Sequence, residues 1–226
     1  PVWVVVALIV AAASWYLKQG EQQTNTETVS ETSAQVEQRS GSKSRSESQR
    51  SGKLGGFDVL NGCRLVKSHR NDGDSFFVKH ADGETEFRIY FVDAPESQYK
   101  EYRDGNNNGD RLRQQGDYFE RLDRDSTVEV GVKAKKCVVE LLGNKPFTVM
   151  TKWESVYGSA RMYAFVIVDD GGKEKFLHEV LVEKGLGRIH TLGVNLPSGM
   201  SSGKQKSKLK GLEAKAKKSR LGAWGM

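Results

Sequence analysis

Hydrophobic and polar residues divide the chain into three regions. Residues 1–17 are almost wholly apolar and uncharged, whereas residues 18–56 contain no aromatic residue and consist mainly of Ser, Thr, Gln, Glu, Lys and Arg. Such a polar composition cannot bury enough surface to offset chain entropy, which predicts a disordered linker. Apolar residues return in short runs after residue 56, so we expect one folded domain at residues 57–226.

The apolar segment 1–17 fits either the core of a secretory signal peptide or a short membrane anchor. Its length is at the lower edge of the roughly 17 to 25 residues that a spanning helix needs. The small residues at 11–14 fit a signal-peptidase site, whereas the Trp-Tyr pair at 15–16 fits an aromatic belt at a membrane surface. Both interpretations place the domain outside the cytosol, either anchored to a membrane and facing outside, or secreted or periplasmic.

Short apolar runs separated by turn residues predict β-strands in the folded domain. The runs CRLVKS, SFFVKHADG and ETEFRIYFVDAP, with an Asp-Gly turn at 82–83, predict a three-stranded meander. The runs KPFTVMTKW and ARMYAFVIVDD predict two more strands. The polar stretch at 97–125 is expected to be a long loop.

Three helices are expected between and after these strands. Apolar residues recur at helical spacing from Val130 to Leu141, with Asp125 or Ser126 as the N-cap and Gly143 as the stop. Residues 174–184 and 208–219 predict two further helices. Five strands with a helix after the third indicate an α+β, mainly β fold: the five-stranded Greek-key barrel called the OB-fold, with about three packed helices. This fold alone assigns no activity.

The net charge indicates which kinds of partner the protein can bind, and the cysteine content indicates whether disulfides or a zinc site are expected. The net charge is +6, and residues 204–220 hold eight Lys or Arg against one Glu. A basic helix of this kind attracts a nucleic-acid backbone, and anionic lipid nearly as well. Cys63 and Cys137 are too few for a disulfide framework and lack the neighbours of a zinc site, and the sequence leaves open whether they pair.

Acidic residues at strand ends predict a metal site. Asp74, Asp93 and Glu96 stand at turns or at the end of a strand, and Pro95 holds Ala94 extended so that its carbonyl oxygen is available. Carboxylates and a backbone carbonyl brought together across adjacent strands form the oxygen-only site that calcium accepts. We therefore expect Asp74, Asp93 and Ala94 as calcium ligands.

Two arginines on the predicted strands suggest a phosphate ligand. Arg88 lies among the apolar residues of FRIYFVDAPE, and Arg161 begins the strand RMYAFVIV. Guanidinium groups beside a cation would hold a phosphate and stabilise the charge that develops when water attacks phosphorus. Glu96 would then take or orient the proton of that water.

The segments DGDS, FRIYFVDAPE, YGSARMYAFV, EVLVEKGLGRI and LEAKAKKSRLGAW resemble the thermonuclease family typified by staphylococcal nuclease. The resemblance implies an OB-fold and Ca²⁺-dependent cleavage of DNA and RNA to 3′-phosphorylated products. It assigns the roles given above to Asp74, Asp93, Ala94, Glu96, Arg88 and Arg161. The family usually has threonine where Ala94 stands. Tyr157 and Tyr163 are candidates for stacking on substrate bases.

Two alternatives remain beside this interpretation. The first is a noncatalytic OB module that binds nucleic acid and uses the acidic residues only for structure. The second concerns DGNNNGD, which places Asp104, Asn106 and Asn108 at EF-hand-like positions, but the twelfth position is Gln115 rather than glutamate, which favours a solvated loop. No internal repeat is visible, so we expect one catalytic unit per chain. We expect the protein to be a monomer, although the sequence does not fix the oligomeric state.

Overall fold

The computed structural model describes residues 52–226. The expected signal or anchor segment, and the expected linker as far as residue 51, lie outside the described residues. Strand β1 (Gly52–Leu54) pairs antiparallel with β2, with Leu54 opposite Phe57. Residues 52–54, which the sequence predicts as part of the linker, thus form a strand in the structure.

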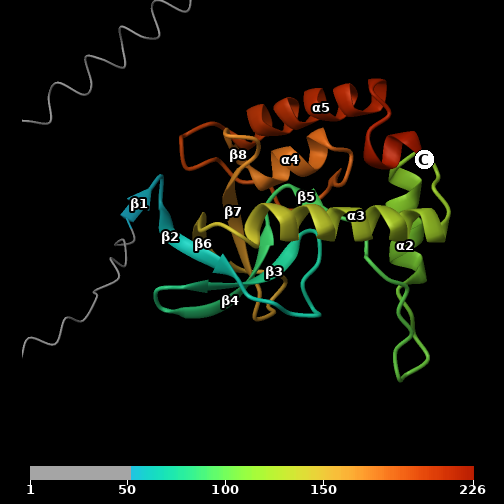
Figure 1. Cartoon of the computed structure of the whole chain (residues 1–226), viewed down its shortest axis with the longest axis horizontal. Coiled ribbons are helices and arrows are strands. Elements are labelled where there is room, and N and C mark those ends of the chain that lie inside the picture. Colours follow the sequence, from blue (N-terminus) through green and yellow to red (C-terminus); the bar gives the residue numbers. More distant parts are fainter. Residues whose placement is uncertain (1–51) are drawn as a thin grey trace, which may run out of the picture. The chain divides into compact units, whose positions relative to one another are not determined.

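The domain contains a closed five-stranded barrel (Figure 1). Its strands follow one another around the barrel in the order β2, β3, β4, β7 and β6, and pairing of β2 with β6 closes the circle. The pairing of β4 with β7 is parallel and the others are antiparallel. Fully buried Phe76, Phe87, Ile89 and Phe165 are part of its core. The expected OB-fold is confirmed. The barrel strands are β2 (Phe57–Leu65), β3 (Ser75–His80), β4 (Gly83–Ile89), β6 (Phe147–Ser155) and β7 (Met162–Asp169).

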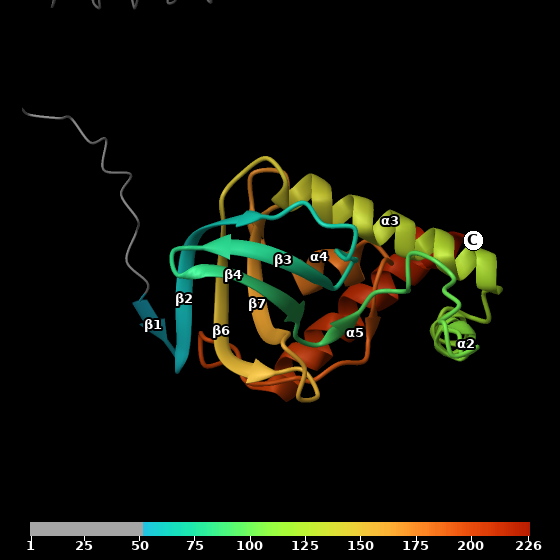
Figure 2. The same cartoon turned by 90° about the horizontal axis from the view of Figure 1, so that it is seen from below.

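Residues 52–226 contain four α-helices, of which α3 and α4 contact strands of the barrel, and Figure 2 shows α3 and α5 from below. None of them is long and apolar enough to cross a membrane. Helix α3 occupies the expected place, but its N-cap is Asp123, whose Oδ1 accepts a hydrogen bond of 2.7 Å from the backbone N–H of Ser126. The helices are α2 (Gly109–Tyr118), α3 (Arg124–Leu142), α4 (Leu177–Glu183) and α5 (Ser202–Lys218), followed by a 3-10 turn at Gly222–Gly225.

Shorter elements differ from the expectation at several boundaries. Residues expected to begin a helix form strand β8 (Glu174–Phe176), which pairs with β7. Helix α5 begins at Ser202 rather than at residue 208, because the Ser201 side chain caps it. Two short strands, β5 (Val92–Asp93) and β9 (Arg188–Ile189), pair with each other outside the barrel sheet. This small sheet places Arg188 directly opposite Asp93.

Helix α2 lies in the stretch that the sequence predicts as a loop. Its sequence, GDRLRQQGDY, has no apolar periodicity, because the buried face consists of Leu112, Gln115 and Gly116. The helix is anchored through its last residue, Tyr118, whose hydroxyl donates to Glu213 on α5 and accepts from the backbone N–H of Ile189 on β9. Fully buried Gln115 occupies a position where an apolar residue would have produced the helical pattern in the sequence.

Both cysteines are free in the structure. Cys63 is fully buried in the barrel core, and burial raises the pKa of its thiol to about 11. Cys137 is partly buried on α3, where burial also raises the pKa of the thiol. Both side chains therefore pack as small, protonated hydrophobic groups.

Candidate functional site

A pocket of about 330 Å³ lies where β4, β5, α2 and the turn before β7 meet. It brings together five of the residues predicted from the sequence, and adds an arginine from α2. The lining residues are Arg88, Asp93, Glu96, Arg111, Tyr157, Arg161, His190 and Thr191.

The segments DGDS and DAPE meet beside this pocket because β3 and β4 are paired. Ser75 lies opposite Arg88 in the ladder, and the backbone N–H of Ala94 donates to Oδ2 of Asp74 at 3.0 Å. The packing is close, since a Cβ added to Gly73 would lie 2.7 Å from Cβ of Ala94 and 2.8 Å from Cβ of Ala134. Only small side chains allow the two segments to approach α3 this closely.

Arg88 is a nearly buried charge on strand β4, and two carboxylates compensate it. Its Nη2 contacts Oδ1 of Asp93 at 2.5 Å and Oδ2 of Asp74 at 3.1 Å. The Nε of Arg88 has no hydrogen-bond partner although it is buried. A buried donor without an acceptor is costly, so this group is suited to an anionic ligand.

Asp93 accepts four hydrogen bonds from four side chains. Oδ1 accepts from Arg88 and from Nη2 of Arg111 at 2.7 Å, and Oδ2 accepts from Nε of Arg188 at 2.7 Å and from Nε2 of Gln115 at 3.1 Å. Burial alone would raise the pKa of Asp93, but the charges of Arg111, Arg188 and Arg88 outweigh it and hold the pKa well below its ordinary value. Asp93 is therefore an ionised carboxylate at any pH near neutrality.

Gln115 holds the DAPE loop with three hydrogen bonds. Its Nε2 donates to Oδ2 of Asp93 and to the carbonyl oxygen of Ala94, both at 3.1 Å. Its Oε1 accepts from the backbone N–H of Glu96 at 3.0 Å. The side chain is completely buried, so the loop takes its shape from α2.

Replacing Gln115 with alanine should lower the free energy of unfolding by about 2–4 kcal/mol, because three buried polar groups lose their partner. Denaturant unfolding followed by far-UV circular dichroism measures this change. Gln114→Ala is the matched control, because this neighbour is exposed and only its backbone oxygen bonds to Arg188. Equal stability of the two variants would show that water replaces the amide.

Arg111 and Arg188 are residues of the candidate site that the sequence did not reveal, and Gln115 was visible only as the residue that breaks the EF-hand-like pattern. Arg111 and Gln115 belong to the stretch predicted as a loop, and Arg188 lies in EVLVEKGLGRI, a segment that carries the family resemblance but contains no predicted site residue. Asp72 is a further neighbour: burial raises the pKa of this carboxyl, and the negative charge of Glu96 contributes to the rise. The DGD motif was visible in the sequence, but only its second aspartate was singled out.

The oxygen atoms beside the pocket are of the kind that a hard cation takes. Asp74, Asp93 and the carbonyl of Ala94 are hard oxygen donors, and one guanidinium nitrogen of Arg88 contacts both carboxylates, so these groups are neighbours. Burial raises the pKa of Asp74 to about 7, against the opposing charge of Arg88. Among residues 52–226, no three His, Cys, Asp or Glu side chains are arranged as a metal site. These oxygen donors are of the chemical type that calcium prefers. For calcium to bind Asp93, it would have to replace one of the hydrogen bonds that this carboxylate accepts.

The remaining predicted residues come from the turn before β7 and from β7 itself. The backbone N–H of Val156 donates to the carbonyl oxygen of Arg161 at 2.8 Å, which closes the turn and brings Arg161 to the pocket. Tyr157 is 88% exposed at the pocket edge. Tyr163 is instead buried, with its ring stacked on Tyr90 at a centroid distance of 5.2 Å. Of the two tyrosines, Tyr157 is the one whose ring is accessible to a base.

The EF-hand-like stretch forms a closed hairpin. The carboxylate of Asp104 accepts from the backbone N–H and the side-chain amide of Asn106. The buried Asn108 side chain accepts from the N–H of Lys100 and donates to the carbonyl of Gln98. These polar groups form hydrogen bonds within the loop and stabilise it. Gln115 donates a hydrogen bond to Asp93 rather than to this loop. The EF-hand-like spacing of Asp and Asn is therefore explained by hydrogen bonding within the hairpin.

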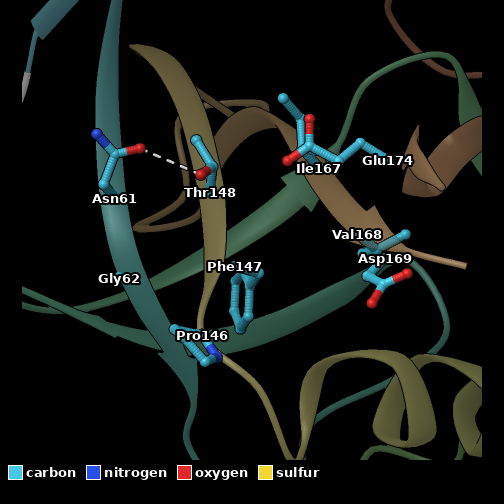
Figure 3. Close-up of a pocket in the computed structure, with 9 residues that line it drawn as sticks. All are labelled: Asn61, Gly62, Pro146, Phe147, Thr148, Ile167, Val168, Asp169 and Glu174. Atoms are coloured by element: carbon cyan, nitrogen blue, oxygen red, sulfur yellow. Dashed lines mark hydrogen bonds between the residues drawn. The ribbon is translucent and has the colours of Figure 1, made fainter. Parts of the chain in front are cut away.

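A second concave surface, of about 240 Å³, lies on the barrel between β2, β6, β7 and β8 (Figure 3). No arginine or lysine lines it, and two of its lining residues, Asp169 and Glu174, are acidic. The polar groups of Asn61 and Thr148 are hydrogen-bonded to each other at 3.1 Å, as the dashed line shows. No cationic side chain of this lining could hold a phosphate, and the Asp169 carboxylate is already paired with Lys145, so the candidate site is the arginine-lined pocket.

Arginines and carboxylates converge in one pocket of a closed OB barrel, an arrangement that fits an anionic ligand. Residues 86–226 match the family described as staphylococcal nuclease homologue. The chain belongs to this family, and its fold is of the nuclease or nucleic-acid-binding type. The matched range includes Arg88, Asp93, Glu96 and Arg161, whereas the DGDS segment precedes it. No curated protein matches the chain.

Proposed function

We propose that this protein is a calcium-dependent nuclease that hydrolyses phosphodiester bonds of both DNA and RNA to 3′-phosphorylated products. The observation that carries the proposal is the pocket in which Arg88, Arg161 and Arg111 lie beside Asp93 and Glu96. A site that only bound a phosphate would need the arginines alone, whereas hydrolysis also needs an acceptor for the proton of water.

The roles follow from position and chemistry. Arg88 and Arg161 hold the scissile phosphate and stabilise the negative charge that grows on its oxygens. Glu96 orients the attacking water and accepts its proton, and Tyr157 stacks on a base at the pocket edge. Calcium held by Asp74, Asp93 and the carbonyl of Ala94 would add positive charge beside the phosphate when bound.

The test is digestion of single-stranded DNA and RNA by the full chain with Ca²⁺ and then with EGTA. Cleavage is expected only with calcium, and Asp74→Ala should abolish it, because this buried carboxylate also holds the backbone of Ala94. Asp82→Ala, in an exposed turn, is the control that should cleave normally. Labelling of the product 3′ ends tests for the 3′-phosphate. The products should accept the label only after treatment with a phosphatase.

The alternative function is binding of nucleic acid without cleavage. The three pocket arginines and the basic outer side of α5 support binding by themselves. Intact DNA and RNA with calcium present, together with oligonucleotide binding that tightens as salt is lowered, would favour this alternative and reject the nuclease.

The place of action is also proposed from the sequence. We place the protein outside the cytosol, either anchored to a membrane through residues 1–17 or secreted, because this segment is apolar and uncharged. DNA and RNA are the proposed partners, and the protein is proposed to act as a monomer because one chain supplies the whole pocket.

A further inference from the structure

One guanidinium group bridges the two carboxylates of the pocket. Arg111, in the first turn of α2, donates from Nε to Oε1 of Glu96 at 2.6 Å and from Nη2 to Oδ1 of Asp93 at 2.7 Å. In the proposed function Asp93 is a calcium ligand and Glu96 orients water. Arg111 therefore holds oxygens that the cation and the water would need.

Asp93 has no acceptor position left in this arrangement. An ionised carboxylate offers about four lone-pair directions. All four are used, because Arg88, Arg111, Arg188 and Gln115 each donate one hydrogen bond. A cation can bind an oxygen of Asp93 only if one of these donors withdraws.

The solvent exposure of the four donor side chains indicates which of them can leave Asp93 at the lowest cost in free energy. The side chains of Arg88 and Arg188 are 9% and 5% exposed, and Gln115 is completely buried, so each would leave a polar group unpaired in the interior. The side chain of Arg111 is 40% exposed and lines the pocket. Arg111 can turn into the open pocket and keep its charge in contact with water.

We propose that Arg111 is a displaceable counter-cation: it neutralises Asp93 and Glu96 when calcium is absent, and on calcium binding it turns to the phosphate of the substrate. The inference rests on the proposed function and deepens it. A divalent cation and a guanidinium repel each other at short distance, so the two compete for Asp93. The released guanidinium then joins Arg88 and Arg161 on the phosphate.

The experiment measures Ca²⁺ binding by isothermal titration calorimetry for the full chain and for Arg111→Gln. Removing the competing charge should tighten Ca²⁺ binding about tenfold. With saturating Ca²⁺, binding of thymidine 5′-monophosphate by Arg111→Gln should be several-fold weaker than in the unmodified chain. Arg113→Gln is the matched control: it removes the same charge from the same helix, where Arg113 forms only an exposed pair with Asp110. Both of its affinities should stay within about twofold.

Each outcome is decisive. Equal or weaker Ca²⁺ binding by Arg111→Gln, with normal binding by the unmodified chain, would overturn the inference and leave the calcium nuclease standing. The inference would also fail if Arg113→Gln tightened Ca²⁺ binding as much, because net charge alone would then explain the effect. Absence of Ca²⁺ binding in all three proteins would overturn the calcium requirement of the proposed function and this inference with it.

Discussion

Replacing Glu96 with glutamine should lower kcat for cleavage of single-stranded DNA by about 10²–10⁴-fold, the usual contribution of a positioned acid or base. Glutamine keeps the size of the side chain and can still accept the hydrogen bond from Arg111, so the loop stays in place. It cannot take a proton from water. The measurement is initial rates at saturating DNA and Ca²⁺, with the unfolding curve recorded for the same preparation.

Glu101→Gln is the matched control for this substitution. Glu101 is exposed on the hairpin that precedes α2 and does not line the pocket. Its variant should cleave at the unmodified rate. A Glu96→Gln enzyme that keeps more than about a tenth of the original kcat would remove Glu96 from the role of general base.

Replacing Asp93 with asparagine should lower the free energy of unfolding by about 3–5 kcal/mol, the cost of leaving buried charges without their partner. Three arginines contact this carboxylate, and those of β4 and β9 are almost completely buried. The asparagine amide carries no negative charge. Its NH2 group would also face two of the side chains that donate to Asp93, so these two donors would have no acceptor. Denaturant unfolding without added metal isolates the effect from calcium binding.

Asp110→Asn provides the comparison for an exposed ion pair. Asp110 contacts Arg113 at 3.1 Å, and both side chains are well exposed, so its loss should change stability by less than about 0.5 kcal/mol. If Asp93→Asn were as stable as this control, water or another acceptor would have to enter beside Arg88 and Arg188. The assignment of Asp93 as the electrostatic centre of the site would then be wrong.

The barrel was predictable because its strands are short and their residues are strongly apolar. Each of the five expected strands overlaps an observed one, since residues such as Phe76, Phe87 and Phe165 belong to apolar runs and fill the core. The meander turn at Gly83 and the helix ending at Gly143 were also visible as local signals. The OB-fold therefore follows from local patterns and their order.

Helix α2 was not predictable by the same means. Its buried positions include Gln115 and Gly116, and its outer positions are charged, so its hydrophobic pattern is that of a loop. What stabilises it is the set of partners it finds on the DAPE loop, on α5 and on β9. The partners on α5 and β9 are distant from α2 in the sequence, and only the DAPE loop lies near it.

The sequence by itself determined the barrel, its family and the pairing of DGDS with FRIYFVDAPE, because β-strand pattern and turn chemistry are local properties. It also indicated that Arg88 needs an anionic partner, since a charge among buried aromatic residues must be compensated. Only the tertiary structure decided that Arg111, Arg188 and Gln115 surround Asp93, and that Tyr163 is buried while Tyr157 is exposed. Hydrogen bonds between distant segments depend on how the elements pack, and no local pattern of residues encodes that packing.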